Sequence, residues 1–354
     1  MRIGVGRYMQ NFASAGGEAA VSDAQVYDEE LALAALAEPL GFDTVWSTSH
    51  YFSPYQMTGN ALQQATFMAG RTKTIDVGTM AMILPWQHPL HVATDVAVLD
   101  QMLAGRRLFL GVGRGAFPQE FASFGIPFEE ASARFLESIE IVKLALTEER
   151  FSYEGRYYSV PPTSIRPRPR HAARLVGDLL VAWSATTPLP PAAHLGVDVL
   201  TVGSRRGSRL RRDVRPFQAF RASRGWSPAR PTLMTFVACT PTDAEGRQQI
   251  EQHVREFLHE GGRHGAAAPL SPAARVRDAA RTVAERFGRR TLPENHVWGT
   301  PERCLARLRE LHEAVAPREV IACFRYGSLT HEQAERSMRL FAERVLPVAQ
   351  SWEA

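Results

Sequence analysis

The stretch LFLGVGRGAFP, residues 108–118, runs from an apolar strand into a glycine-rich turn. A dinucleotide-binding fingerprint would need Gly-x-Gly-x-x-Gly opening directly into a helix. Here the spacing is Gly-x-Gly-x-Gly, Arg114 fills the turn, and Phe117-Pro118 stand where a helix should already be running. The stretch therefore indicates a strand that ends at a turn. The turn carries either a guanidinium suited to gripping phosphate or a plain surface arginine.

The composition is that of an ordinary globular protein: 354 residues, 45% hydrophobic and 22% charged. No apolar run reaches the roughly 20 residues that a bilayer span needs, and the N-terminus has no apolar signal core. We therefore expect a cytoplasmic protein without membrane association. Scattered Cys239, Cys304 and Cys323 argue against a disulfide framework or thiolate metal site. The net charge of +4 is too balanced to predict nucleic-acid binding.

Short apolar runs alternate with longer helical patterns along almost the whole chain. Strands are predicted at 3–6, 44–47, 75–78, 108–112, 179–182, 199–202, 233–238 and 320–324. Helices are predicted at 22–39, 60–70, 89–103, 132–147, 188–195, 206–224, 243–259, 301–314 and 331–349. Strands that alternate with helices predict a parallel sheet, and eight such repeats favour an α/β protein with a closed (β/α)8 TIM barrel over an open doubly wound sheet.

Two segments depart from this alternation within the single domain expected over residues 1–354, and a third segment is notable for its charge. Residues 151–160 predict a small hairpin that turns at Glu154-Gly155. Residues 260–296 are rich in Gly, Ala, Pro and Arg, and predict a partly helical, mobile insertion that could act as a lid. Residues 205–215 hold six arginines against one aspartate, which indicates a solvated helix face or a dock for an anionic ligand or acidic carrier protein.

Function in such a barrel sits just after the strands. The residues there are Arg7-Tyr8, Ser49-His50-Tyr51, Met80-Ala81, Gly113-Arg114, Trp183-Ser184, Thr186-Thr187, Gly203-Ser204 and Arg325-Tyr326. This set lacks paired carboxylates of the glycosidase kind, and no Gly-x-Ser-x-Gly elbow occurs in the chain. His88 and His91 have no carboxylate at ligand spacing, so no metal site is predicted. An organic cofactor is the favoured carrier of the chemistry.

Several motifs at consistent spacing resemble those of the bacterial luciferase-like flavin monooxygenases. They are GFDTVW at 41–46, SHYF at 49–52, RTKTIDVGTMAMILPWQHP at 71–89, DQMLAGRRLFLGVGRG at 100–115, Phe124-Gly125, 151–157, VAWSATTP at 181–188, HLGVDVL at 194–200 and WGTPE at 298–302. The likeness covers most of the first 205 residues and is weaker beyond. It implies a barrel that binds reduced FMN.

The resemblance also implies which residues hold the cofactor. Arg114, after Gly113, matches the arginine that grips the flavin phosphate, and Ser184 and Thr187 match positions that hydrogen-bond it. Trp183 stands where luciferase has a glutamate, so a contribution there would come from the backbone. Arg134 is similar to a second family arginine after a two-residue adjustment of the alignment. Met80-Ala81 matches a position where the family can hold a non-proline cis peptide under the flavin ring.

His50 matches the histidine that acts as a base near the flavin. The family often shows Glu-His-His-Phe, whereas this chain has Ser49-His50-Tyr51-Phe52, so one candidate carboxylate for orienting His50 is lost. The acid–base chemistry is therefore expected to differ from aldehyde oxidation. The substrate pocket is predicted from Tyr8, Ser49, Tyr51, Phe52, Trp86 and Phe117.

The resemblance implies a two-component monooxygenase that takes reduced FMN from a separate reductase and oxygenates a small organic substrate with O₂ through a flavin 4a-hydroperoxide. Two alternatives stay open: a deazaflavin-dependent hydride-transfer enzyme and a non-catalytic flavin-binding partner subunit. A homodimer is also implied, because the family pairs through helices near residues 84–100.

Overall fold

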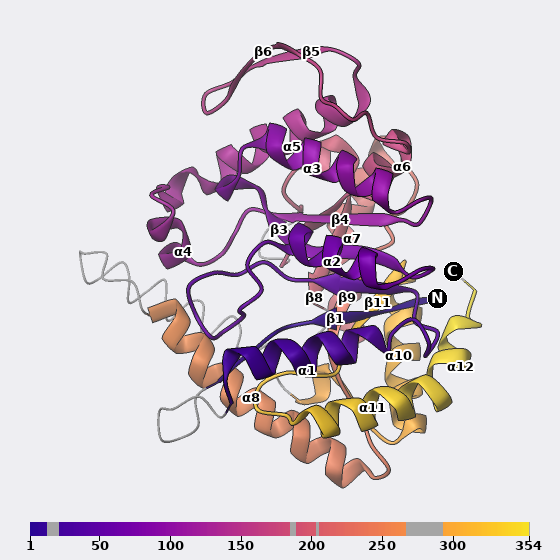
Figure 1. The fold of residues 1–354 in the computed structure, drawn as a ribbon. Helices are drawn as coiled ribbons and strands as arrows, with labels where there is room; N and C mark the ends of the chain where they lie inside the picture. Colours follow the sequence, from indigo (N-terminus) through magenta and orange to yellow (C-terminus); the bar gives the residue numbers. More distant parts are fainter. Residues whose placement is uncertain (13–20, 185–188, 203–204, 267–292, 354) are drawn as a thin grey trace.

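The computed structural model describes residues 1–12, 21–184, 189–202, 205–266 and 293–353. Its parallel barrel strands are β1 (Arg2–Arg7), β2 (Thr44–Ser47), β3 (Asp76–Ile83), β4 (Leu108–Gly113), β7 (Leu180–Ala182), β8 (Asp198–Val202), β9 (Thr232–Cys239) and β11 (Glu319–Cys323). They pair in the order β9-β11-β1-β2-β3-β4-β7-β8, and a further β8–β9 pairing closes the ring. The predicted TIM barrel is confirmed, and the open sheet is excluded (Figure 1).

Helices surround the strands on the outside (Figure 1). The longer ones are α1 (Asp23–Ala35), α2 (Ala61–Arg71), α3 (Pro89–Met102), α5 (Ala131–Thr147), α7 (Gly207–Ser223), α8 (Asp243–Ala266), α10 (Pro301–Val315) and α11 (His331–Arg344). Shorter ones are α4 (Pro118–Ser123), α6 (Ala172–Gly177), α12 (Leu346–Gln350) and the 3₁₀ turns Leu84–Trp86, Phe128–Glu130, Ala193–Leu195 and Pro293–Asn295. The two termini meet, since the Met1 ammonium donates to the Trp352 carbonyl oxygen at 2.6 Å.

Outside the barrel, the hairpin of β5 (Phe151–Glu154) and β6 (Ser159–Thr163) confirms the prediction for 151–160. The prediction of a helix over 188–195 is wrong for the described part of that range, which holds only a 3₁₀ turn, because prolines 190 and 191 supply no backbone N–H. A short strand, β10 (Val297–Gly299), was not predicted and pairs with β9. Of the predicted insertion, 260–266 belong to α8, and 267–292 lie outside the described residues.

The barrel interior is filled at the end where the strands begin. Trp46 is fully buried there and stacks on Phe109 with ring centroids 5.6 Å apart. A Cβ atom at Gly78 would lie 2.5 Å from the Trp46 ring, so the indole fits only because that position has no side chain. The Trp46 Nε1–H donates to Glu319 Oε1 at 2.8 Å. This plug of Trp46, Phe109 and Glu319 fills the base of the barrel.

Two histidines are buried between α8, β9 and the segment before β10. His253 and His296 lie against Phe236, with ring centroids 4.2 and 5.3 Å from it. Burial lowers the pKa of His253 and lowers the pKa of His296 to about 3. The ordinary pKa of a histidine is 6.5. Below that pH the two histidines bind protons in the unfolded chain but stay neutral in the folded one.

The free energy of unfolding is therefore expected to hold its full value above pH 6.5. It should fall as the pH drops from 6.5 toward 3, because the two buried histidines resist protonation. The slope should reach about 1.4 kcal/mol per pH unit for each histidine. Urea unfolding at a series of pH values measures it, and His296→Gln should flatten the slope by about one histidine's share. An unchanged slope in that variant would show that other groups govern acid unfolding.

Candidate active site

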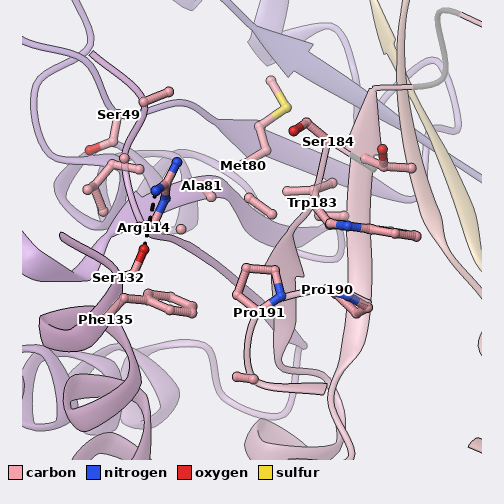
Figure 2. Close-up of a pocket in the computed structure, with 18 of the residues that line it drawn as sticks. Ser49, Met80, Ala81, Arg114, Ser132, Phe135, Trp183, Ser184, Pro190 and Pro191 are labelled. Carbon is pink, nitrogen blue, oxygen red and sulfur yellow. Dashed lines mark hydrogen bonds between the residues drawn. The ribbon is translucent and has the colours of Figure 1, made fainter. Parts of the chain in front are cut away.

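A cavity of about 820 Å³ opens at the end of the barrel where the strands finish. That volume lies within the roughly 300–1,000 Å³ typical of small-molecule sites. Its walls are mainly apolar, with a few polar side chains that follow β2, β4 and β7 (Figure 2). The arrangement matches the rule that barrel enzymes place their sites on the loops after the strands.

His50 follows β2 and is paired with a carboxylate from a distant element. Its Nδ1 lies 3.1 Å from Oε1 of Glu120, a fully buried residue of α4. The same oxygen accepts the Tyr51 backbone N–H at 2.8 Å. Tyr55 and Phe117 contact the imidazole edge-on, with ring centroids 5.3 and 5.4 Å away. His50 is thus held in one orientation at the cavity wall.

This pairing selects a tautomer of His50. The Glu120 oxygen acts as an acceptor toward Tyr51 N–H, and a carboxylate favours a donor on its other side as well. The proton of neutral His50 is then on Nδ1, which leaves Nε2 as the basic nitrogen. The carboxylate that orients His50 is therefore Glu120, a residue of a distant element, and does not come from the position before His50.

Arg114 stands directly after β4 and contacts the start of α5. Its Nη1 donates to Ser132 Oγ at 3.2 Å, and both side chains line the cavity (Figure 2). The guanidinium also lies 5.8 Å from the centre of the Phe128 ring. A cation with a hydroxyl at its side is a donor set that suits an anionic oxygen group such as phosphate.

β3 changes its register where it reaches the cavity. The pairing with β4 shifts between Thr79 and Met82, and the Met80–Ala81 peptide bond in between is cis. The cis bond expected at this non-proline position is present. Both residues line the cavity between Arg114 and Trp183 in the view of Figure 2.

The wall across from Arg114 comes from the residues after β7. Trp183 is buried and packs edge-on against Phe217 of α7 with ring centroids 6.2 Å apart. Ser184 follows it on the same wall (Figure 2). The cavity thus lies between a cation on one side and a hydroxyl and an indole on the other.

Most of the predicted site residues line this one cavity: Tyr8, Ser49, His50, Met80, Ala81, Trp86, Gly113, Arg114, Phe117, Trp183 and Ser184. Tyr51, Phe52 and Arg134 do not line it. Phe52 is 64% exposed, and Arg134 forms an ion pair with Glu130 at 2.8 Å. Thr187 lies outside the described residues.

Several lining residues were not predicted. Glu120 and Ser132 carry the most chemistry, and the others include Tyr55, Gln56, Phe135, Thr201, Phe220 and Met234. Ser132 opens the helix predicted over 132–147, and its hydroxyl carried no signal in the sequence. Glu120, between Gln119 and Phe121, carried no signal either.

The part of the chain that the structure describes shows neither a metal cluster nor a membrane-spanning helix. No group of three or more His, Cys, Asp or Glu side chains there is arranged to hold a metal ion. No helix in those ranges is both long and apolar enough to cross a membrane.

Comparisons with known proteins identify relatives with the same organisation. The alkanal monooxygenase alpha chain of Aliivibrio fischeri is 36% identical over 129 residues, 36% of this chain and 36% of that protein. Monooxygenase RslO1 from Streptomyces bottropensis has a solved structure with a TM-score of 0.77 and 26% identity, covering 98% of this chain and 99% of that one. The oxygenating constituent of 3,6-diketocamphane monooxygenase from Pseudomonas putida, solved in complex with FMN, shares the fold with a TM-score of 0.75 and 21% identity, covering 98% of each chain.

The matches to curated relatives are partial, since the first two span 42% and 36% of those proteins' lengths. The family described as luciferase-like monooxygenase, by contrast, matches residues 5–318. Barrel, cavity and residue pattern agree with that match, and the chain belongs to the luciferase-like monooxygenase family.

Proposed function

We propose that this protein is a two-component monooxygenase that receives reduced FMN from a separate flavin reductase and uses O₂ to oxygenate a small organic substrate. The observation that carries the proposal is the Arg114–Ser132 pair on the wall of the same apolar cavity that His50 lines. Membership of the luciferase-like family supports the choice of a flavin.

Arg114 would hold the FMN phosphate, because a guanidinium offers both positive charge and parallel N–H donors. The Ser132 and Ser184 hydroxyls line the cavity and would add donors to the remaining phosphate oxygens. The aromatic and aliphatic walls suit a flat ring system. The residues present therefore fit FMN.

Reduced FMN supplies the electrons that activate O₂ when it is bound. His50 would accept or return a proton at Nε2, while Glu120 holds the imidazole through Nδ1. Trp86, Phe117 and Trp183 line the cavity and would keep water out of the site. Alkanals are the first compounds to test, because one relative is an alkanal monooxygenase alpha chain.

The experiment mixes the protein anaerobically with reduced FMN and an alkanal and then adds ¹⁸O₂. The oxidation of the flavin is followed by absorbance, and the product is identified by its mass. The wild-type protein should slow the oxidation of the flavin by oxygen and place one labelled atom in the product. Arg114→Ala should weaken FMN binding roughly 10–100-fold, because charge-assisted hydrogen bonds contribute about 1.5–3 kcal/mol.

Arg134→Ala is the matched control, because Arg134 is also on the α5 side of the barrel but pairs with Glu130 and does not line the cavity. It should leave FMN binding unchanged. Equal losses in both variants would remove Arg114 from the phosphate site. Tight binding of a deazaflavin with no FMN binding would replace the proposal by hydride transfer, and FMN binding without any turnover would favour a non-catalytic subunit.

The partners proposed with this function are the reductase, a second copy of the chain and, for the arginine-rich run, an acidic carrier protein. The dimer contact is placed at residues 84–100 on the family resemblance. Sedimentation of the pure protein as a single monomeric species would reject the dimer. For the carrier protein, charge reversal at Arg211 and Arg212 without any change in binding would reject that partner.

A further inference from the structure

Arg205 opens the arginine-rich run but is not a surface residue. It is 5% exposed, whereas the other arginines of the run are exposed on or just before α7 (Arg206, Arg209, Arg211, Arg212 and Arg215). A guanidinium is costly to bury unless its N–H groups find partners. The identity of those partners therefore indicates what this arginine does.

Two different nitrogens of Arg205 contact two different elements. Nη1 donates to Asp213 Oδ2 at 2.6 Å, within α7. Nη2 donates to the backbone carbonyl oxygen of Ser184 at 2.5 Å, beyond the end of β7. A planar, forked guanidinium directs two separate nitrogens at two acceptors in a fixed geometry, which the single nitrogen of a lysine does not.

The Ser184 carbonyl lies where the sheet no longer fixes the backbone. The β7–β8 register ends at Ala182, and the last backbone bond along that edge runs from Trp183 N–H to the Leu200 oxygen. One step farther along the chain, the Arg205 contact is a hydrogen bond that joins the Ser184 backbone to the α7 side of the barrel. Ser184 itself faces the cavity across from Arg114 (Figure 2).

The backbone of Arg205 is itself held by a residue of α10. Its own carbonyl oxygen accepts from Arg307 Nη2 of α10 at 2.6 Å, and the same Arg307 nitrogen donates to the Asn295 carbonyl oxygen at 3.0 Å. Arg307 is 9% exposed and pairs with Glu310. A chain of buried contacts thus connects α10 through Arg205 to the cavity wall.

We propose that Arg205 is a positioning residue for the cofactor's phosphate, which it serves by holding the Ser184 backbone and therefore the Ser184 hydroxyl in place. This inference rests on the proposed function. It separates Arg205 from the rest of its run, whose exposed members do not touch the cavity. A residue 21 positions after Ser184 thereby becomes part of the cofactor site without contacting the cofactor.

The test compares the affinity of the full-length protein for FMN and for riboflavin, which has the same ring system but no phosphate. Both are followed by quenching of flavin fluorescence, alongside thermal unfolding. Arg205→Ala should weaken FMN binding about ten-fold and leave riboflavin binding unchanged, so the preference for FMN falls by the same factor. Asp213→Asn, which removes the charge that orients Arg205, should shift the preference in the same direction.

Arg209→Ala is the matched control, since Arg209 approaches the same Asp213 oxygen at 3.8 Å from the exposed side. It should behave as wild type. In the double variant Ser184→Ala/Arg205→Ala, the loss should be smaller than the sum of the single losses, because both act on one contact.

A purely structural role would weaken FMN and riboflavin equally, and that result would overturn the inference. An unchanged FMN preference in Asp213→Asn and Arg205→Ala, with a reduced one in Ser184→Ala, would also overturn it while leaving the proposed function intact. A wild-type protein without any preference for FMN would reject the phosphate site and this inference together. If Arg205→Ala fails to fold, the preference for FMN over riboflavin in Asp213→Asn decides whether the inference holds.

Discussion

Replacing His50 with alanine should lower turnover by roughly 10²–10⁴-fold, the usual contribution of a general acid or base. FMN affinity should stay within about two-fold, because the phosphate donors are on other elements. The measurement is single-turnover product formation, on whichever member of an alkanal, ketone and phenol panel the wild-type enzyme oxygenates. His91→Ala is the control, since His91 is exposed on α3. Equal turnover in His50→Ala and wild type would remove His50 from the mechanism.

Glu120→Gln tests how His50 is held. The amide keeps the size of the side chain and can still accept from the Tyr51 N–H, but it loses the charge that favours the Nδ1–H tautomer. Turnover should fall about ten-fold with unchanged FMN affinity, a smaller loss than in His50→Ala. In a His50→Ala background the same substitution should have almost no further effect, because the two residues act as one unit. Additive losses would show that Glu120 acts on its own.

Replacing Glu319 with alanine should cost about 3–5 kcal/mol of folding free energy, because it removes a buried hydrogen-bond acceptor and leaves a cavity. Its carboxylate is fully buried and accepts from Trp46 Nε1 at 2.8 Å and from Arg2 Nε at 3.2 Å. Alanine would leave a buried indole N–H without an acceptor and a void in the base of the barrel. Urea unfolding at pH 7 measures the loss.

Glu319→Gln should lie within about 1 kcal/mol of the wild type. Burial raises the pKa of Glu319 even though Arg2 stands beside it, so the buried charge contributes little net stability, whereas the hydrogen bond to Trp46 survives in glutamine. Glu313→Ala, on the exposed side of α10, should change stability by less than about 0.5 kcal/mol. A large loss in the glutamine variant would mean that the charge, and not the hydrogen bond, stabilises the barrel.

The sequence predicted the barrel because each strand is a short apolar run and each helix a longer amphipathic one. Its errors are local. β3 was expected to stop at Gly78, but it continues to Ile83 through an irregular register, and a glycine in a strand reads as a breaker. β10 has three residues, too few to show a pattern. The helix expected over 188–195 does not form in the described part of that range, because prolines 190 and 191 lack a backbone N–H.

For the site, sequence reasoning found residues that directly follow strands. It missed residues that lie on helices, such as Glu120 on α4 and Ser132 on α5. Glu120 is 70 positions from His50 and meets it only because β2 and β4 open at the same end of the barrel. Arg205 was grouped with its exposed neighbours, because local charge carries no information on burial. Arg134 was predicted from the family resemblance, whereas the structure places the Ser132 hydroxyl beside Arg114 and pairs Arg134 with Glu130.

The Trp46 plug has a consequence for redesigning this enzyme. Because the indole, Phe109 and Glu319 occupy the barrel where the strands begin, bulkier compounds cannot be admitted by hollowing out the scaffold. Room for them has to come from cavity-lining positions that are not fully buried, such as Leu189, Pro191 and His194. Libraries confined to those three positions should change selectivity with little change in melting temperature, whereas substitutions in the plug should destabilise the fold.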